Sequence, residues 1–227
     1  MNKKRIDGVI AAVLGACLVI FSVGLTMYNI ISDRKAGKES EEIVGELLSD
    51  IPWHTEEPEI QNETAYEEVY TEPEVPFYEI NPEMDMPEKE IDSRYYIGVL
   101  YIDTLGLELP VRSELTYTGL RMSPCRYKGS VYQRNLIIAA HNYNSHFGKL
   151  KNLPIGSVVR FIDVDGNEFE YTADSIEVIN GTNVDAMDEG EWDLTLFTCT
   201  YGGVERVTVR CREIEDLEDY EDYIVEF

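Results

Sequence analysis

Two adjacent strand-forming stretches, joined by a Gly-Gly pair at positions 202–203, constrain the fold of this chain most strongly. The run 194–201 reads Leu-Thr-Leu-Phe-Thr-Cys-Thr-Tyr, and 204–210 reads Val-Glu-Arg-Val-Thr-Val-Arg. Two glycines between such runs are typical of a β-hairpin with a two-residue loop. In that register Cys199 lies directly opposite Arg206, on the same face of the sheet.

This register has a chemical consequence for the cysteine. A fixed guanidinium beside a thiol favours the thiolate, which is the nucleophilic form. Arg206 can instead stabilise the oxyanion that forms when Cys199 attacks a carbonyl. A shift of one residue would move Arg206 to the opposite face of the sheet. The competing interpretation is structural, with a small buried cysteine and a solvated edge arginine.

The N-terminal part of the chain predicts one membrane-spanning helix over residues 8–31. A basic cluster at positions 3–5 precedes an apolar run without charges, long enough to cross about 30 Å of hydrocarbon. The run exceeds a signal-peptide core, and residues 29–33 offer no small-residue cleavage site. Basic residues flank both ends, so the acidic segment that follows decides the orientation. We expect an uncleaved anchor, with residues 1–7 in the cytoplasm and the rest of the chain outside the cell.

Residues 32–92 predict a flexible tether. The segment is rich in Asp, Glu and Pro, so it buries too little apolar surface to offset its chain entropy. A short helix over 41–48 is one exception to consider. Two short apolar stretches, 51–53 and 76–78, interrupt this segment (the apolar islands). They either dock on the domain as a lid or remain exposed.

The net charge of -25 resides mainly in this tether and in an acidic tail, 213–227, that we expect to be solvated. Acidic and basic residues nearly balance over 93–212, and no basic stripe is present. We therefore expect no nucleic-acid partner.

Residues 93–212 predict a single all-β domain. The clearest hairpin is 157–173, where alternating apolar and polar residues flank an Asp-Gly turn at 165–166. Residues 135–140 form a continuous apolar run, which is typical of a strand buried on both faces. Roughly seven or eight short strands with little helix indicate a closed or nearly closed β-barrel, which carries function on its rim.

A histidine at the end of the buried run supplies the second half of a candidate site. His141 is held by the strand before it, whereas His54 lies in the tether and His146 in a loop. With Cys199 and Arg206 it forms a set suited to acyl transfer: nucleophile, proton carrier and oxyanion partner. The sequence places no carboxylate to orient the imidazole, so a full triad is not evident.

Other interpretations of these positions remain open. His141 can be a capping residue, and a zinc site would draw on Cys199, His141, His146 and Cys125. The cysteine spacing matches no metal knuckle, so we expect no metal, and a Cys199–Cys125 disulfide stays open. Arg210 is the competing arginine. It lies on the same face as Arg206, but further from the thiol.

These motifs resemble those of the sortases, the membrane-anchored cysteine transpeptidases of Gram-positive bacteria. The matching features are Thr195-Leu-Phe-Thr-Cys199 with Arg206 in the next strand, Ala140-His141-Asn142 with Phe147-Gly148-x-Leu150, and Tyr96-Ile-Gly-x-Leu100 with Leu109-Pro110-Val111. They occur in the family's order over residues 93–212. The interval between His141 and Cys199 has no room for the long helix of class B, so the chain resembles a compact class A, D or E member.

The resemblance implies an eight-stranded barrel that binds a Leu-Pro-x-Thr-Gly-like sorting signal of a secreted protein. It implies that Cys199 attacks the carbonyl before the final glycine, that His141 transfers protons, and that Arg206 holds the peptide or the oxyanion. Thr198 is implied as a substrate contact beside the cysteine. An amine of a peptidoglycan precursor or a pilin would resolve the thioester, with no cofactor. The segment 51–53 differs from the lid of pilin polymerases, which favours anchoring over pilus assembly.

Three functions follow from the sequence. The first, which we expect, is a transpeptidase that anchors secreted proteins at the cell surface. The second is a membrane-anchored cysteine peptidase with the same site, in which water takes the acyl group. The third is a non-enzymatic surface-binding barrel whose Cys199 is structural.

Overall fold

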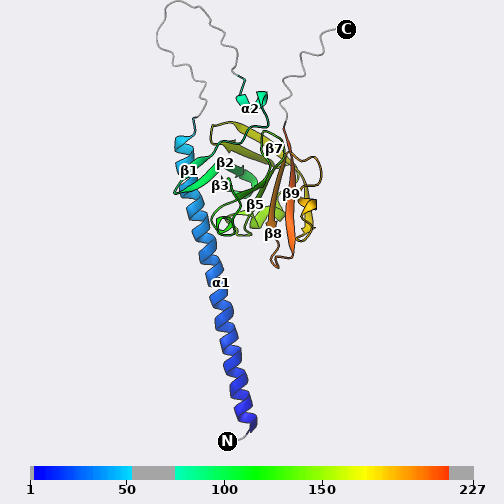
Figure 1. Cartoon of the computed structure of the whole chain (residues 1–227). Helices are drawn as coiled ribbons and strands as arrows, with labels where there is room; N and C mark the ends of the chain where they lie inside the picture. The colour runs from blue at the N-terminus through cyan, green and yellow to red at the C-terminus, as the bar shows by residue number, and fades with distance from the viewer. Residues whose placement is uncertain (1–2, 53–74, 215–227) are drawn as a thin grey trace, which may run out of the picture.

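A closed β-barrel forms the body of the molecule, and one long helix runs along its side (Figure 1). The computed structural model describes residues 3–52 and 75–214. The barrel strands are β2 (Arg94–Ile102), β3 (Leu107–Arg112), β4 (Cys125–Lys128), β5 (Leu136–Ala140), β6 (Val158–Asp163), β7 (Glu168–Asn180), β8 (Leu194–Cys199) and β9 (Glu205–Glu213). A three-residue strand, β1 (Lys89–Ile91), extends the sheet beyond β2. Short 3-10 helices, η1 (Asp103–Leu105), η2 (Gly119–Arg121), η3 (Phe147–Asn152) and η4 (Asp185–Met187), lie in the connections.

The strand order β2-β3-β4-β5-β8-β9-β7-β6 closes on itself, because β2 pairs with β3 and also with β6. Gly98 permits this second pairing. A Cβ at this position would lie 2.1 Å from the carbonyl oxygen of Ile162 in β6, and its φ of +155° is one that other residues rarely adopt. The predicted all-β, eight-stranded barrel is confirmed.

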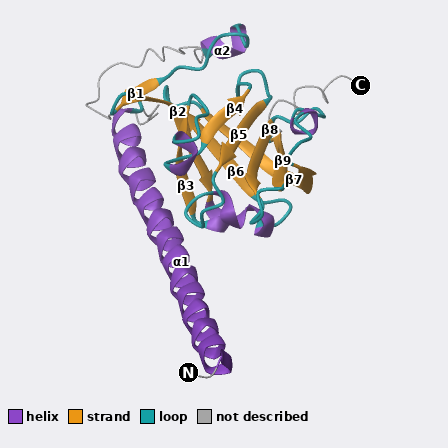
Figure 2. Cartoon of the chain, turned by 60° about the horizontal axis from the view of Figure 1, so that its bottom comes forward, coloured by secondary structure: helices purple, strands orange, loops and turns teal. Residues whose placement is uncertain are grey.

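Alternation along each strand separates the barrel interior from its exterior. In β9 the side chains of Val207, Val209 and Cys211 belong to the buried core. Arg206 and Arg210 therefore point to the outside, because successive side chains of a strand face opposite ways. Figure 2 shows the barrel with its bottom turned forward, where loops and short helices surround the strand ends.

Helix α1 (Lys3–Asp50) has two halves that differ in their surroundings. Its apolar half is exposed throughout the window that qualifies it as a candidate membrane span. Its second half packs on the barrel through a helical stripe of buried side chains, Ala36, Ser40, Ile43, Val44 and Leu47. This spacing of three and four residues is the pattern of one helix face.

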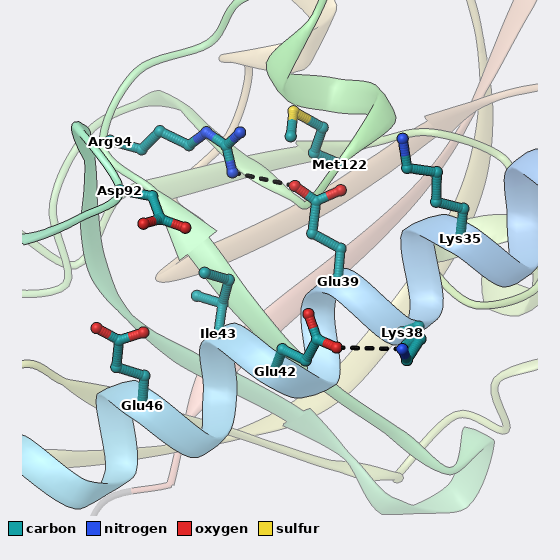
Figure 3. Close-up of a pocket in the computed structure, with 9 residues that line it drawn as sticks. All are labelled: Lys35, Lys38, Glu39, Glu42, Ile43, Glu46, Asp92, Arg94 and Met122. Carbon is teal, nitrogen blue, oxygen red and sulfur yellow. Dashed lines mark hydrogen bonds and ion pairs between the residues drawn. The ribbon is translucent and has the colours of Figure 1, made fainter.

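Polar contacts supplement this packing. Figure 3 shows Glu39 of α1 directed at Arg94 of β2, and their side chains form an ion pair at 3.0 Å. Asp50, at the end of the helix, pairs with Lys89 of β1 at 2.7 Å. Both pairs involve partly exposed side chains, so the buried apolar stripe supplies most of the docking energy.

The structure differs in part from the predicted tether over 32–92. Residues 32–50 are helical, because they continue α1 and their apolar stripe finds a partner surface on the barrel. Residues 75–92 contain α2 (Phe77–Ile80) and β1, and Tyr78 stacks on Tyr132 with ring centroids 4.7 Å apart. The island at 76–78 thus docks on the barrel. Residues 53–74 and most of the tail 213–227 lie outside the described residues.

Replacing Leu47 by Ala should loosen α1 from the barrel. Leu47 is 1 % exposed, and its truncation leaves a cavity at a well-packed contact. A cost of about 2–4 kcal/mol follows, which lowers the thermal midpoint of the full chain in detergent by several degrees. The matched control is Glu46→Ala, since Glu46 is the exposed neighbour on the same helix. Equal midpoints for the two variants would show that the stripe contributes nothing.

Candidate active site

The register of three strands brings the predicted site residues to one rim of the barrel. β5 and β8 are parallel, and their last pair is Ala140 with Thr198. β8 and β9 are antiparallel, and Cys199 is paired with Arg206. The predicted hairpin register is therefore confirmed. His141 follows Ala140, and Cys199 follows Thr198, so each lies one residue beyond the last pair of this ladder.

All three side chains belong to the outer face of the barrel by alternation. Leu194 and Leu196 of β8 lie in the core, which places Cys199 on the opposite, outward side. Leu136, Ile138 and Ala140 of β5 are likewise interior, so the next residue along β5, His141, has the outward parity. The candidate nucleophile is thus set on the surface of the molecule, whereas Cys125 and Cys211 are buried.

A small pocket of about 150 Å³ opens beside the cysteine. Cys199 lines it together with Asn142, Gly148 and Lys151. The cysteine is exposed and its thiol is free. A peptide carbonyl can therefore reach the sulfur from outside without rearrangement of the barrel.

Burial distinguishes this thiol from its neighbours. Removal from water raises the pKa of the Cys125 thiol to about 11, because the charged form is disfavoured there. The pKa of the Cys211 thiol is raised to about 12 for the same reason. These two cysteines serve as small apolar core residues. The alternative of a Cys199–Cys125 disulfide does not match the structure, in which all four cysteines are free.

His141 stacks face to face on Tyr143, with ring centroids 4.0 Å apart and an interplanar angle of 9°. Burial lowers the pKa of its imidazole, a hydrogen bond with Asn142 opposes this shift, and the charge of Arg121 adds to it. The ring is therefore neutral at pH 7, which is the form that accepts a proton. Its buried Nδ1 has no hydrogen-bond partner among the described residues.

The guanidinium of Arg206 lies over the hairpin turn. Its Nη1 donates to the carbonyl oxygens of Gly203, at 2.9 Å, and Glu205, at 3.1 Å. Arg206 is therefore across the ladder from Cys199, with its charged group on neutral backbone acceptors.

Arg210, the competing arginine, has a different environment. It is 2 % exposed and donates to the carbonyl oxygens of Met187, at 2.8 Å, and Ala186, at 2.5 Å. It also donates to the hydroxyl of Thr195, its cross-strand partner in β8, at 3.1 Å. Arg210 thus fastens η4, in the loop between β7 and β8, to the side of the barrel.

Thr198 lies next to the cysteine but faces the interior. It is buried, and its hydroxyl donates to the carbonyl oxygen of Ala140 at 2.8 Å. This bond ties the end of β8 to the end of β5, so it fixes the spacing between the cysteine and the histidine. Thr198 also lines the pocket.

The loop that carries His141 also contacts α1, and no local sequence pattern predicts this contact. The carboxylate of Asp33 accepts hydrogen bonds from the backbone N–H of Ser145, at 2.9 Å, and from its hydroxyl, at 2.6 Å. Burial alone would raise the pKa of Asp33, but these bonds outweigh it and lower the pKa. A Cβ at Gly37 would lie 3.0 Å from Cβ of Ser145, so the helix approaches the loop closely.

His146 has a structural environment. It is fully buried, and its Nε2 lies 3.4 Å from the hydroxyl of Ser40 on α1. Burial lowers the pKa of its imidazole to about 4, and the nearby His141 adds to this shift. Its ring also contacts Tyr143, with centroids 5.8 Å apart, so a chain of contacts runs from α1 through His146 and Tyr143 to His141.

The described residues contain no group of three or more His, Cys, Asp or Glu side chains placed to hold a metal ion. The zinc ligands considered from the sequence are separated by their burial. Cys125 lies in the barrel wall and His146 points to α1, while Cys199 is at the surface.

The structure is a β-barrel with an exposed cysteine and a histidine at the ends of neighbouring strands. Comparison with known proteins identifies the family to which this barrel belongs. The family model described as the sortase domain matches residues 100–214. The chain belongs to the sortase family. No curated protein sequence matches it.

Several solved sortase structures are similar to this chain. Sortase A from Corynebacterium diphtheriae is 20 % identical, with a TM-score of 0.50, and the match covers 56 % of this chain and 65 % of that one. Sortase C from Clostridium perfringens SM101 is also 20 % identical, with a TM-score of 0.45 and coverage of 57 % and 73 %. Sortase D5 from Clostridium perfringens is 20 % identical, with a TM-score of 0.46 and coverage of 53 % and 79 %. This chain thus spans about two thirds of the first of these structures.

Replacing Asp33 by Ala should free the histidine loop. The variant loses the charged acceptor of three hydrogen bonds, two from Ser145 and a longer one from Asn144. This loss costs about 1.5 kcal/mol or roughly a tenfold change in the local opening equilibrium. Hydrogen–deuterium exchange over residues 141–148 should therefore be faster in the full chain, while exchange in β2 and β6 is unchanged.

Glu42→Ala is the matched control, because Glu42 is an exposed carboxylate on the same helix that pairs only with Lys38 at 3.4 Å in the described ion pairs. In the Glu42→Ala protein, residues 141–148 should exchange at the wild-type rate. Identical exchange in the Asp33 variant and the control would contradict a role of α1 in holding the loop.

Proposed function

We propose that this chain is a cysteine transpeptidase that α1 anchors in the cell membrane with its barrel outside the cell. It cleaves a Leu-Pro-x-Thr-Gly-like sorting signal of secreted proteins and transfers the acyl group to an amine. The observation that carries the proposal is the exposed thiol of Cys199, placed by strand register beside the strand that delivers His141 and opposite Arg206. Membership of the sortase family supports it.

The proposed reaction has two acyl-transfer steps. The thiolate of Cys199 adds to the scissile carbonyl, and the oxyanion collapses to a thioester as the peptide amine leaves. The neutral imidazole of His141 takes the proton of the Cys199 thiol to form this thiolate, and it then gives that proton to the leaving amine. An acceptor amine then attacks the thioester, gives its proton to His141, and releases the sulfur. No metal or cofactor is required by this scheme.

Arg206 is the proposed partner of the oxyanion or of the peptide carbonyl. Its present acceptors are the carbonyl oxygens of Gly203 and Glu205, which are neutral groups at the surface. If the guanidinium of Arg206 donates instead to a developing negative charge, its hydrogen bonds become stronger, because charge-assisted hydrogen bonds are stronger than those to neutral acceptors. The same movement would bring the guanidinium towards Cys199 across the ladder.

The outer face next to the cysteine suits an extended peptide. Phe197, two residues before Cys199 on the same face, packs edge to face against Tyr127 of β4, with ring centroids 5.4 Å apart. Ala139 of β5 is the strand partner of Phe197 on the same face, and its side chain is buried. We propose this apolar floor as the seat of the sorting signal, with Thr198 acting through the spacing of the strand ends.

The short connection between His141 and Cys199 supports the compact sortase class that the sequence resembles. Within the described residues only two short 3-10 helices, η3 and η4, lie between His141 and Cys199. We therefore propose a compact, class A, D or E-like enzyme that uses a peptidoglycan precursor or a pilin as the amine acceptor, with anchoring preferred to pilus assembly.

Substitution of the three site residues tests the proposal. Cys199→Ala, His141→Ala and Arg206→Ala should each lower turnover of a sorting peptide by about 10²–10⁴-fold, because each removes one chemical role. The assay mixes the full chain in detergent with a peptide library and a nucleophilic amine, and it separates amide product from free acid by mass spectrometry. Free acid as the main product would instead identify a hydrolytic peptidase.

The two arginines give a sharper comparison. Arg206→Ala should show this loss of turnover while the thermal midpoint stays near that of the wild type, since the described hydrogen bonds of its guanidinium go to exposed carbonyls. Arg210→Ala should lower the midpoint, because it removes a buried guanidinium and leaves the carbonyls of Met187 and Ala186 unpaired. Normal turnover in the Arg206 variant would overturn its assignment.

A further inference from the structure

The docking of α1 fixes the height of the barrel above the membrane that the helix is proposed to span. The apolar run ends at Ile31, and the first barrel contact is made two residues later by Asp33. Two residues of helix rise only about 3 Å. Tyr28 itself lines a hollow together with Arg121 and Tyr143 of the barrel. The barrel therefore begins where the apolar helix ends.

The end of the barrel that lies at this level is the active-site end. Ser145, in the loop that follows His141, contacts Asp33. The opposite end of the barrel meets the far end of α1, where a Cβ at Gly166 would lie 2.5 Å from the carbonyl oxygen of Pro52. Figure 1 shows the same arrangement, with the β8–β9 hairpin pointing towards the N-terminal half of α1.

Aromatic and aliphatic side chains are exposed at this end. Tyr201 and Val204, at the tip of the β8–β9 hairpin, are 85 % and 66 % exposed, and Tyr117, just before η2, is 76 % exposed. Each aromatic ring has a cation beside it. Nζ of Lys151 lies 5.9 Å from the centroid of Tyr201, and the guanidinium of Arg121 lies 5.1 Å from that of Tyr117.

Basic residues also lie at this end, although the chain carries a net charge of -25. Lys35 and Arg121 line the hollow beside Tyr28, and Lys151 lines the pocket beside Cys199. Glu205 of the hairpin and Asp33 of α1 are acidic residues at the same end. Tyrosines with neighbouring basic residues are the composition of a surface at the level of lipid headgroups, where rings sit in the interface and cations meet anionic lipids.

We propose that the active-site end of the barrel rests on the bilayer that α1 spans, with Tyr117 and Tyr201 at headgroup level and the basic residues against anionic lipid. This inference rests on the proposed membrane span, not on the proposed chemistry. The pocket beside Cys199 then opens close to the membrane surface.

Tryptophan placed at these positions reports contact with lipid directly. The background is the full chain with Trp53→Phe and Trp192→Phe, reconstituted in phosphatidylglycerol-containing vesicles with or without brominated acyl chains. Tyr201→Trp and Tyr117→Trp should show blue-shifted emission and strong quenching by brominated lipid. Neither residue is assigned a chemical role, so the readout is independent of transpeptidation.

Tyr95→Trp is the matched control. Tyr95 is also an exposed tyrosine, 49 % accessible, but it is paired with Glu90 of β1 at the far end of α1. Its emission should be unaffected by brominated lipid. Equal, weak quenching at all three positions would overturn the proposal. Emission that changes with protein density rather than with lipid bromination would overturn it too, since it would identify a second copy of the chain as the occupant of this surface.

Discussion

Strand register at one rim of the barrel is the constraint on which the candidate site depends. Parallel pairing of β5 with β8 and antiparallel pairing of β8 with β9 set the ends of three strands side by side. Cys199 and Arg206 are thereby fixed by backbone hydrogen bonds, and His141 begins the loop that leaves β5. A shift of one residue in either ladder would turn a site residue into the core. Closure of the barrel protects this register, because no strand of the closed ring is left with a free edge.

The rim is supported by contacts that lie outside the ladders. Thr198 joins two strand ends, and Arg210 fastens the loop between β7 and β8. Asp33 of α1 holds Ser145, in the loop behind the histidine. The helix proposed to span the membrane and the loop that carries His141 are therefore parts of one packed unit. This arrangement links the position of the bilayer to the position of the proposed chemistry.

Local sequence patterns were sufficient to predict the barrel and the pairing of Cys199 with Arg206, because alternation and a Gly-Gly turn determine both. The role of residues 32–50 was not predictable in the same way. Their acidic composition indicated a tether. The buried stripe that includes Leu47 can be recognised as a packing face only when the barrel surface that covers it is known. The contact between Asp33 and Ser145 joins positions 112 residues apart, and no local pattern reports such a pair. Side-chain directions, such as that of Thr198, likewise depend on packing.

The central claim is that Cys199 becomes acylated by a peptide and passes the acyl group to an amine. Intact-mass measurement of the full chain, quenched in acid soon after mixing with a sorting peptide, tests it most directly. We expect an added mass equal to the acyl fragment on Cys199, which disappears when an amine is added and is absent in the Cys199→Ala protein. Product formation without that adduct, or an adduct that persists in the Cys199→Ala protein, would contradict it.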